Sequence, residues 1–406
     1  MSRPTAAASA EILTDPDFWQ GNRQDATFRI LRERAPISWQ PEPVTSWNPK
    51  GGPGFWSVVT HALVTEVSRN PDIFGSRHGT EIIDLEPEVY QLAGMLNMDA
   101  PEHTRLRQIV SRVFTPRRVT AMLRDIRLRA HDIVDRMAGA GEFDFVAEVA
   151  DTYPAGIVAD VMGVAPSDVP DLVDLTKQIL SPPPERAHHA NLQMIEYGTG
   201  LARERATTPT DDLLSLLVQA EVDGRRLTPE EIGVFFALLL TAGIETTGTA
   251  LSHAIVALHD FPGQRALWLT DYPALAPAAV EEVFRWASPV RRFRRTALAD
   301  TELAGTPIAA GDKVVMWYSS ANRDDTAFAD PATFDITRSP NPHLAFGGGG
   351  HHFCLGANLA RAETAAFLDA FLHAFPRYEL TGEVVYAQND MFNVITSIPC
   401  ASGGPR

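Results

Sequence analysis

The stretch HLAFGGGGHHFCLG, residues 343–356, decides how the rest of this chain is interpreted. It places four consecutive glycines and two histidines just before Cys354, one of only two cysteines in 406 residues. Glycines make a turn-rich loop free of side chains, and the following ANLARAETAAFLDAFLHAF has helical periodicity. Cys354 is therefore expected at a loop-to-helix junction, where unpaired amides favour a thiolate over a thiol. Gly356 leaves room for a flat group to lie close.

Three other interpretations of this loop are a buried structural cysteine, a zinc site and a phosphate-binding loop. A zinc site with His351 and His352 would need more ligands, usually a second cysteine nearby, and the sequence contains no C-x-x-C. A phosphate loop would need Lys followed by Ser or Thr after the glycines, and a nucleotide-binding strand before them. Neither is found, so the buried cysteine remains the open alternative at this point.

The composition is that of an ordinary globular protein, with 45% hydrophobic and 21% charged residues. A net charge of −16 argues against a protein that binds nucleic acid through an overall positive field. No run approaches the roughly 18 uninterrupted apolar residues of a membrane helix, and MSRPTAAASAEILTDPDF lacks the apolar centre of a secretory signal. We therefore expect a cytoplasmic enzyme with no nucleic-acid and no membrane partner.

The chain has no internal repeat and no low-complexity linker, and SPPPER, residues 181–186, is its strongest break. Strand-like pieces such as FWSVV, residues 55–59, lie in the first hundred residues, and helical periodicity begins near residue 101. The longest helix is expected after Thr228 as N-cap, with Pro229 in its first turn and Glu231 completing a capping box. Its first half is apolar nearly all round, which is typical of a helix buried in a large core.

Polar residues interrupt this helix in TAGIETTG, residues 241–248. A buried acid or hydroxyl costs several kcal/mol unless it is hydrogen-bonded. One interpretation is that a threonine bonds back to its own helix while Glu245 reaches a surface. The other is that the helix passes a cavity, that Gly243 lets a bulky group approach, and that Glu245 and Thr246 relay protons into the cavity.

From about residue 15 to residue 400 the chain resembles the cytochrome P-450 family of haem-thiolate monooxygenases, most of all its soluble actinobacterial class, and four separated motifs carry the resemblance. The resemblance implies a mainly α fold with smaller β regions, in which haem b lies between a long central helix and the cysteine-loop helix. We expect one domain over residues 1–406. Its β-containing N-terminal part would cover about 1–100, its helical core about 101–290, and further strands with the cysteine loop about 291–406.

The cysteine loop carries the first motif, because FGGGGHHFCLGANLAR resembles the family signature F-G-x-G-x-H-x-C-x-G. The resemblance makes Cys354 the axial ligand of the haem iron, His352 a propionate partner and Gly356 a haem contact. Phe346 precedes Cys354 by eight residues where the common pattern has seven, so one extra residue is expected among the glycines. Branches of the family that act on steroids and on methyl-branched lipids share this longer loop.

The central-helix motif is AGIETT, which implies that Ala242 contacts haem, that Glu245 is the proton-delivery acid and that Thr246 is the oxygen-stabilising alcohol. A further motif is formed by PEHTRLR and RRTA, which match cationic partners of the haem propionates. The residues implied are His103 and Arg107, four apart on one helix face, and Arg295.

The remaining motif is E-x-x-R in EEVFR, where Glu282 and Arg285 share a helix face. An isolated E-x-x-R is usually a surface ion pair. Its place some 70 residues before the cysteine, with FDITR at 334–338 between them, instead implies the family's buried Glu–Arg–Arg network. Arg338 is the expected third member, and Asn322 and Arg323 also fit the pattern.

The implied reaction inserts one oxygen atom from O2 into a hydrophobic small molecule such as a steroid, a lipid, an aromatic compound or a secondary metabolite. The sequence has no recognisable flavin or nicotinamide domain, so a separate ferredoxin and ferredoxin reductase are the expected electron donors, and a monomer is expected. A peroxide-driven haem-thiolate enzyme and a non-catalytic haem-binding sensor are the alternatives.

The residues expected around the substrate are mostly apolar. RRFRR, residues 291–295, is the exception. We expect one of its first two arginines to pair with a substrate carboxylate or phenolate, and the alternative is that both are solvated at a strand edge. The predicted substrate contacts are Leu238, Thr241, Val290, Arg291, Arg292 and Phe392.

Overall fold

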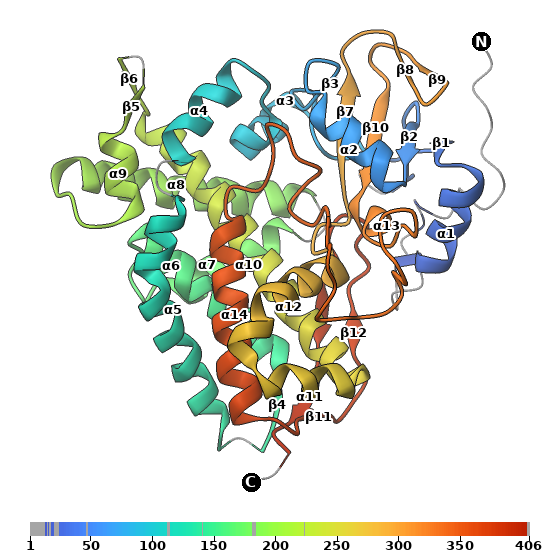
Figure 1. The fold of residues 1–406 in the computed structure, drawn as a ribbon. Coiled ribbons are helices and arrows are strands. Elements are labelled where there is room, and N and C mark those ends of the chain that lie inside the picture. The colour runs from blue at the N-terminus through green and yellow to red at the C-terminus, as the bar shows by residue number, and fades with distance from the viewer. Residues whose placement is uncertain are drawn as a thin grey trace. The chain divides into compact units, whose positions relative to one another are not determined.

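The computed structural model describes residues 13, 15, 18, 19, 24–45, 48–111, 114–139, 141–180, 184–222 and 224–403. Helices predominate over short strands (Figure 1), which confirms the predicted mainly α class. Residue contacts divide the chain into two compact units. Unit 1 comprises Met1–Leu85, His253–Cys354 and Glu383–Ile398, and unit 2 comprises Glu86–Ser252, Leu355–Gly382 and Pro399–Arg406. Each unit thus draws on all three of the sequence blocks expected above.

Unit 1 contains a five-stranded sheet with the order β1-β2-β10-β7-β3. Its strands are β1 (Ile37–Gln40), β2 (Phe55–Val58), β3 (Phe74–Gly75), β7 (Arg292–Ala297) and β10 (Lys313–Trp317). β2 and β10 run parallel with Phe55 opposite Lys313, and the other neighbours are antiparallel. This pairing explains why a unit that begins at the N-terminus also needs strands from the last third of the chain.

Both faces of the two central strands are covered, because successive side chains of a strand point to opposite sides. One apolar cluster holds Trp56, Val58, Val314 and Met316. The other cluster holds Phe55, Val315 and Trp317 together with Trp19 and Phe28. In the second cluster, the rings of Trp19 and Trp317 stack with their centroids 5.3 Å apart.

The other elements of unit 1 are helices and two-stranded ribbons. They are α1 (Gln24–Arg34), α2 (His61–Arg69), α11 (Pro262–Thr270), α12 (Tyr272–Ala287), α13 (Tyr318–Ala321), β8 (Thr301–Leu303) paired with β9 (Thr306–Ile308), and β12 (Val385–Tyr386) paired with β13 (Ile395–Ser397). The expectation of strands and loops in the first hundred residues misses α1 and α2. Each is short and buries a narrow apolar stripe, so its periodic signal is weak.

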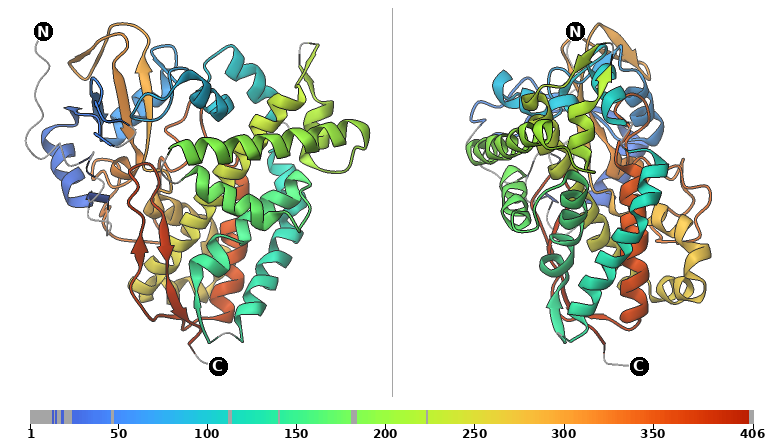
Figure 2. Two further views of the ribbon diagram at one scale, coloured as in Figure 1. Left: turned by 180° about the vertical axis from the view of Figure 1, so that it is seen from behind. Right: turned by 90° about the vertical axis from the view of Figure 1, so that its left-hand side faces the viewer.

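Unit 2 is helical, and its last long helix, α14 (Ala357–Ala374), packs along α5 (Pro116–Met137), as Figures 1 and 2 show. Its other helices are α3 (Pro87–Tyr90), η3 (Gln91–Asn97), α4 (Glu102–Ser111), η4 (Val146–Ala150), α6 (Tyr153–Met162), α7 (Val169–Ile179), α8 (Pro184–Thr207) and α9 (Leu213–Gln219). Its strands are β4 (Glu142–Asp144), β11 (Glu379–Leu380) and β14 (Pro399–Ala401) in one sheet, and β5 (Glu221–Val222) with β6 (Arg225–Arg226) in another. The predicted break at SPPPER falls where α7 ends and α8 begins: residues 181–183 are outside the described part, and Pro184 is the first residue of α8.

The longest helix, α10 (Pro229–Asp260), runs from unit 2 into unit 1. Its predicted start is confirmed: Glu231 N donates to Thr228 Oγ1 over 3.2 Å and Thr228 N donates to the Glu231 carboxylate over 2.9 Å. Among the described helices it alone is long and apolar enough to cross a membrane by length and composition. In its most apolar stretch of 18 residues, 56% is buried inside the protein. A helix in a protein core meets the same criteria of length and composition.

A carboxyl group lies on the buried face of α14. Glu363 is only 1% exposed and bonds to Thr247 of α10, and its Oε2 has no hydrogen-bond partner among the described residues. The Tyr153 hydroxyl donates to the main-chain oxygen of Glu363 over 3.1 Å. Burial raises the pKa of Glu363 to about 8, against the lowering effect of the Thr247 bond. The carboxyl is therefore mostly protonated at neutral pH.

Glu363→Gln should stabilise the protein increasingly as the pH rises from 5 to 8. An acid whose pKa is raised by folding binds its proton more tightly in the folded state, so its contribution to stability falls across this window by up to roughly 1.4 kcal/mol per pH unit. Glutamine removes this slope. Urea unfolding of both proteins at several pH values measures it, with Glu196→Gln on the exposed side of α8 as control. Parallel pH profiles for wild type and Glu363→Gln would contradict the assignment.

Candidate functional site

The cysteine loop of unit 1 folds back on itself before α14 begins. Gly347, Gly349 and Gly350 have φ of 96°, 90° and 79°, a left-handed region that favours glycine. Cys354 N donates to Phe346 O over 2.9 Å, so the loop closes although it is one residue longer than the common pattern. Phe346 is buried, and its ring centroid lies 4.5 Å from that of Phe284 on α12.

The two cysteines differ in their surroundings. Cys354 is exposed and lies three residues before α14, so it is not the buried structural cysteine left open by the sequence. Cys400 is buried in β14, where burial raises the pKa of its thiol to about 12. The two cysteines are not joined by a disulfide. Of the two, only Cys354 is accessible to a metal or a reactant.

The middle of α10 leaves one face of an otherwise buried helix uncovered by protein. Ala242 is exposed, and Leu238, Thr241, Glu245 and Thr246 are partly exposed. The spacing of three and four residues places these side chains on one side of the helix. Gly356, at the start of α14 in the same unit, has no atom within 4 Å of the position that a Cβ would take. Within unit 2, the uncovered face of α10 and the open position at Gly356 are each compatible with a flat, mostly apolar group.

The polar residues of this helix divide between the two interpretations given above. The Thr246 hydroxyl donates to Ala242 O over 2.7 Å, so it does bond back to its own helix. Gly243 and Gly248 accommodate other parts of unit 2: a Cβ at Gly243 would lie 2.9 Å from the Val158 side chain, and one at Gly248 would lie 2.5 Å from Ala150 O. The expectation that Gly243 admits a non-protein group is therefore wrong, because Val158 of α6 takes that space.

Glu245 is half-buried, and its environment favours the neutral acid. Burial raises the pKa of Glu245 to about 7, with a further rise from the negative charge of Asp151 and an opposing effect from Lys177. Asp151 and Lys177 form an ion pair with 2.6 Å between Oδ2 and Nζ. A carboxyl with a pKa near neutrality can both accept and release a proton at physiological pH, as a relay requires.

The candidate propionate partners belong to both units. His103 is buried on α4 of unit 2, one turn from the partly exposed Arg107. Arg295 is buried on β7 of unit 1 and donates to Arg294 O over 2.9 Å. The Nε2 of His352 lies 3.2 Å from the Ser76 hydroxyl, also in unit 1. The donor chemistry of these four side chains, two guanidinium groups and two imidazoles, suits carboxylates.

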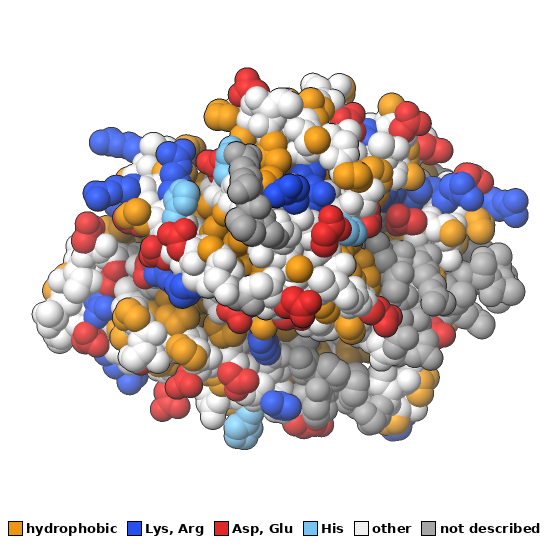
Figure 3. All heavy atoms as spheres, turned by 90° about the horizontal axis from the view of Figure 1, so that it is seen from below, with side chains coloured by type: hydrophobic (Ala, Val, Ile, Leu, Met, Phe, Trp, Pro, Cys, Tyr) orange, Lys and Arg blue, Asp and Glu red, His pale blue; other side chains and the backbone are white. Residues whose placement is uncertain are grey.

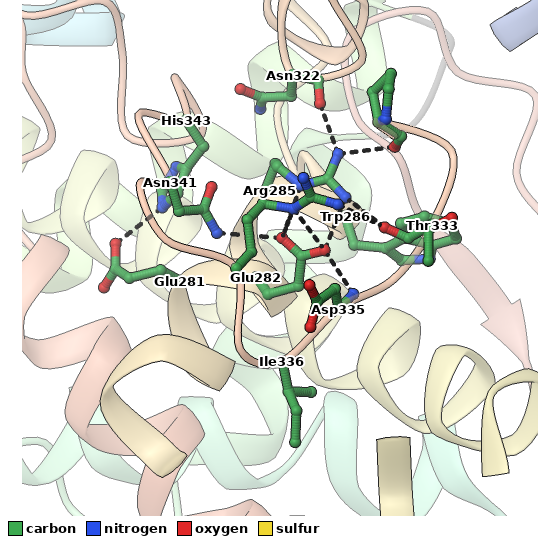
Figure 4. Close-up of polar contacts among 12 residues, drawn as sticks. Glu281, Glu282, Arg285, Trp286, Asn322, Thr333, Asp335, Ile336, Asn341 and His343 are labelled. Atoms are coloured by element: carbon green, nitrogen blue, oxygen red, sulfur yellow. Dashed lines mark hydrogen bonds and ion pairs between the residues drawn. The ribbon is translucent and has the colours of Figure 1, made fainter. Parts of the chain in front are cut away.

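The predicted Glu–Arg–Arg set comes together inside unit 1. Arg285 donates to both oxygens of Glu282 over 2.7 and 2.8 Å, and Arg338 Nε lies 3.1 Å from the nearer oxygen. Figure 4 shows the Arg285 guanidinium and the Asn341 amide directed at the Glu282 carboxylate. Arg323 instead donates to the main-chain oxygens of residues 285 and 286, so Arg338 is the arginine that closes the set on Glu282.

Two predicted substrate residues, Val290 just before β7 and Phe392 in the C-terminal turn, are neighbours, since they form a β-bridge. The arginines that follow Val290 do not fit either expectation. Arg291 is buried, bonds to Asn389 O and to Asn393 Oδ1, and stacks 4.8 Å from the Trp19 ring. Arg292 is buried between Asp390 and Glu81 at 2.8 and 3.1 Å. Neither is solvated, and protein acceptors already hold both guanidinium groups, because a buried cation needs such partners.

Comparison with known proteins agrees with these motifs. The pattern of the family described as Cytochrome P450 matches residues 274–388. The methyl-branched lipid omega-hydroxylase of Mycobacterium tuberculosis is 43% identical over 98% of this chain and 96% of that protein. The steroid C26-monooxygenase of Rhodococcus jostii is 38% identical over 100% of this chain and 89% of that protein.

Solved structures give the same result. A cytochrome P450 of Mycobacterium marinum in complex with pseudoionone superposes with a TM-score of 0.92, at 39% identity over 98% of this chain and 99% of that one. A structure from Novosphingobium aromaticivorans superposes with a TM-score of 0.89, at 32% identity and with the same coverage.

Sequence reasoning missed two features near the site. Glu363 carried a usable signal, since it is the one acid within the apolar stripe that runs from Leu359 to Phe371. The contacts of Ser68 and Arg69 with the glycine loop, described below, carried none. They join segments that are some 280 residues apart, and neither residue belongs to a motif.

Glu282→Gln should destabilise the protein by about 3–5 kcal/mol, because it leaves the buried guanidinium groups of Arg285 and Arg338 without their anion. The matched control is Glu221→Gln, which breaks an exposed pair with Arg226 and should change the stability by less than about 1 kcal/mol. Urea unfolding followed by circular dichroism measures both. Equal effects of the two substitutions would show that the buried set adds nothing to the fold.

Proposed function

Because the chain belongs to the cytochrome P450 family and is a haem-thiolate monooxygenase of hydrophobic small molecules, we propose that it hydroxylates the terminal methyl group of a methyl-branched aliphatic chain. Its cofactor is haem b and its co-substrate is O2, as in its relatives. The names of these relatives support the substrate class: one acts at the omega position of methyl-branched lipids, and another at steroid C26. Both positions end a branched aliphatic chain.

One observation carries the proposed site: Cys354 is an exposed thiol just before α14, in a chain that is similar to its relative over 98% of its length. We propose that Cys354 would hold the haem iron through its sulfur, and that Gly356 would leave room for the macrocycle. Haem, when bound, supplies the activation of O2, and a thiolate ligand donates electron density to the iron. The amides at the beginning of α14 stabilise the negative charge on sulfur.

The remaining haem contacts follow from charge and shape. We propose that His103, Arg107, Arg295 and His352 hold the propionates, since buried carboxylates require hydrogen-bonded cations. Ala242 has a side chain small enough to let a flat ring approach α10 closely. The uncovered face around Ala242 supports this role.

We propose that Glu245 and Thr246 hold and pass on protons at the uncovered face of α10. The Thr246 hydroxyl donates its proton to Ala242 O, which leaves its oxygen lone pairs available to accept a hydrogen bond. Glu245, with a pKa raised to about 7, exchanges protons with water on the side of Asp151 and Lys177. An intact acid–alcohol pair favours O2-dependent turnover over the peroxide-driven and sensor alternatives, which have no need of it.

Leu238, Thr241, Val290 and Phe392 are the proposed substrate contacts. Leu238 and Thr241 belong to the uncovered face of α10, and Val290 and Phe392 are joined by their bridge. We do not assign a substrate carboxylate to Arg291 or Arg292, whose partners are Asn389, Asn393, Asp390 and Glu81. We propose instead that these arginines hold the turn that carries Phe392.

We further propose that a ferredoxin and its reductase supply the electrons, and that the enzyme acts as a monomer in the cytoplasm. The net charge of −16 and the mixed charges on the face in Figure 3, where Lys and Arg side chains are scattered among Asp and Glu, give no support to a nucleic-acid partner. Any contact with an acidic ferredoxin would have to use a local group of basic side chains.

A methyl-branched fatty acid should be converted to its terminal alcohol when the protein is supplied with a surrogate ferredoxin, ferredoxin reductase and NADPH. A straight-chain acid of equal carbon number is the control and should react more slowly. Mass spectrometry of the products gives the position of the hydroxyl. Hydroxylation at internal carbons would contradict the proposed regiochemistry. Turnover with hydrogen peroxide alone, and none with the electron-transfer proteins, would favour the peroxide-driven alternative.

Glu245→Gln should lower the turnover number about 10²-fold or more, the usual contribution of a positioned proton donor. It should also remove a pH dependence centred near pH 7, because the wild-type carboxyl changes from mostly neutral below that pH to mostly ionised above it. Thr246→Ala should uncouple oxygen consumption from product formation. Steady-state rates between pH 6 and 8 test this, with Glu230→Gln at the exposed start of the same helix as control. An unchanged pH profile in Glu245→Gln would exclude the relay.

A further inference from the structure

The glycine run of the cysteine loop packs directly on the last turn of α2, within unit 1. A Cβ on Gly348 would lie 2.8 Å from Ser68 Cβ and 3.2 Å from Val64 O. A Cβ on Gly350 would lie 2.6 Å from Ser68 O. Real side chains do not approach so closely, so only a bare backbone reaches this surface of the helix. The glycines therefore allow the close packing of the loop on α2 as well as the turn.

Two side chains of α2 donate hydrogen bonds to this bare backbone. The Ser68 hydroxyl donates to Gly349 O over 2.9 Å, and Arg69 Nε donates to Gly348 O over 3.2 Å. Ser68 is buried, whereas Arg69 is largely exposed. The carbonyl groups of this loop belong to no helix or sheet that would supply a backbone donor. Side-chain donors therefore complete their hydrogen bonding.

The extra residue of the loop explains why such donors are needed. The hydrogen bond from Cys354 N to Phe346 O closes the loop, and Phe346 keeps its packing on Phe284. The additional length must then be taken up between these two residues, where the glycines meet α2. Four consecutive glycines lose more backbone freedom on ordering than any other four residues, so this segment needs anchors to stay in one conformation.

We propose that Ser68 and Arg69 are positioning residues that fix the long glycine loop and thereby hold Cys354 in the geometry of an iron ligand. This inference rests on the proposed role of Cys354. The two side chains act through the carbonyl groups of Gly349 and Gly348. Loss of either donor would free the loop, so Cys354 would hold the iron less firmly.

The test uses purified holoenzyme reduced with dithionite and saturated with carbon monoxide, so no ferredoxin takes part. The absorption band for which the family is named reports thiolate ligation, and its loss during mild warming gives a rate. Ser68→Ala and Arg69→Ala should each raise this rate about 2- to 10-fold, as expected for one lost hydrogen bond. The double variant should show roughly the product of the two effects, and Gly350→Ala should act in the same direction.

Two controls separate positioning from general stability. Glu66→Ala, on the exposed side of α2, should lose the band at the wild-type rate. Helix unfolding, followed by far-ultraviolet circular dichroism at the same temperature, should be unchanged in all variants.

Wild-type rates of band loss in Ser68→Ala and Arg69→Ala would overturn the inference, as would an equal acceleration of unfolding. An effect of Arg69→Ala confined to the ferredoxin concentration dependence would also overturn it, since Arg69 would then serve docking. A wild-type protein that never shows the band would instead refute the proposed role of Cys354, so the two failures are distinguishable.

Discussion

A carboxylate with no exposed surface, that of Glu282, determines how the segment before the cysteine loop is arranged. Such a group is stable in the interior only when its charge and lone pairs are met, and Arg285, Arg338 and Asn341 meet them. These partners come from α12 and from the irregular segment that follows α13. The same segment is tied down where Leu344 N donates to Asn322 Oδ1 over 2.7 Å. The cysteine loop therefore starts from an ordered position although four of its own residues are glycines.

α10 combines two demands that oppose each other. A long core helix gains stability from apolar side chains on all sides, and most of α10 has them. Its middle turns leave Ala242 exposed and place Glu245 and Thr246 on the same side of the helix. The acid is kept near neutrality by desolvation, and the alcohol is satisfied by its own helix. This stretch departs from local rules of helix composition, as functional sites often do.

The sequence predicts well those features that are set by local pattern. The start of α10 follows from a capping box, and the position of Cys354 before α14 follows from glycines and periodicity. Glu282, Arg285 and Arg338 could be named because the motif has a characteristic place in the chain. The bonding of Arg291 and Arg292 could not be foreseen, since their acceptors lie in loops remote from β7. The same holds for Ser68 and Arg69, whose contact with the glycine loop is created by the pairing of distant strands and helices.

The most direct test of this account is the ligand of the haem iron. Reduced, carbon monoxide-saturated spectra of wild type, Cys354→Ser and Cys400→Ser compare the exposed thiol with the buried one. The account predicts the thiolate-specific band in wild type and in Cys400→Ser, and its absence in Cys354→Ser. A Cys354→Ser protein that kept the band, or a wild-type holoprotein that lacked it, would contradict the assignment of Cys354.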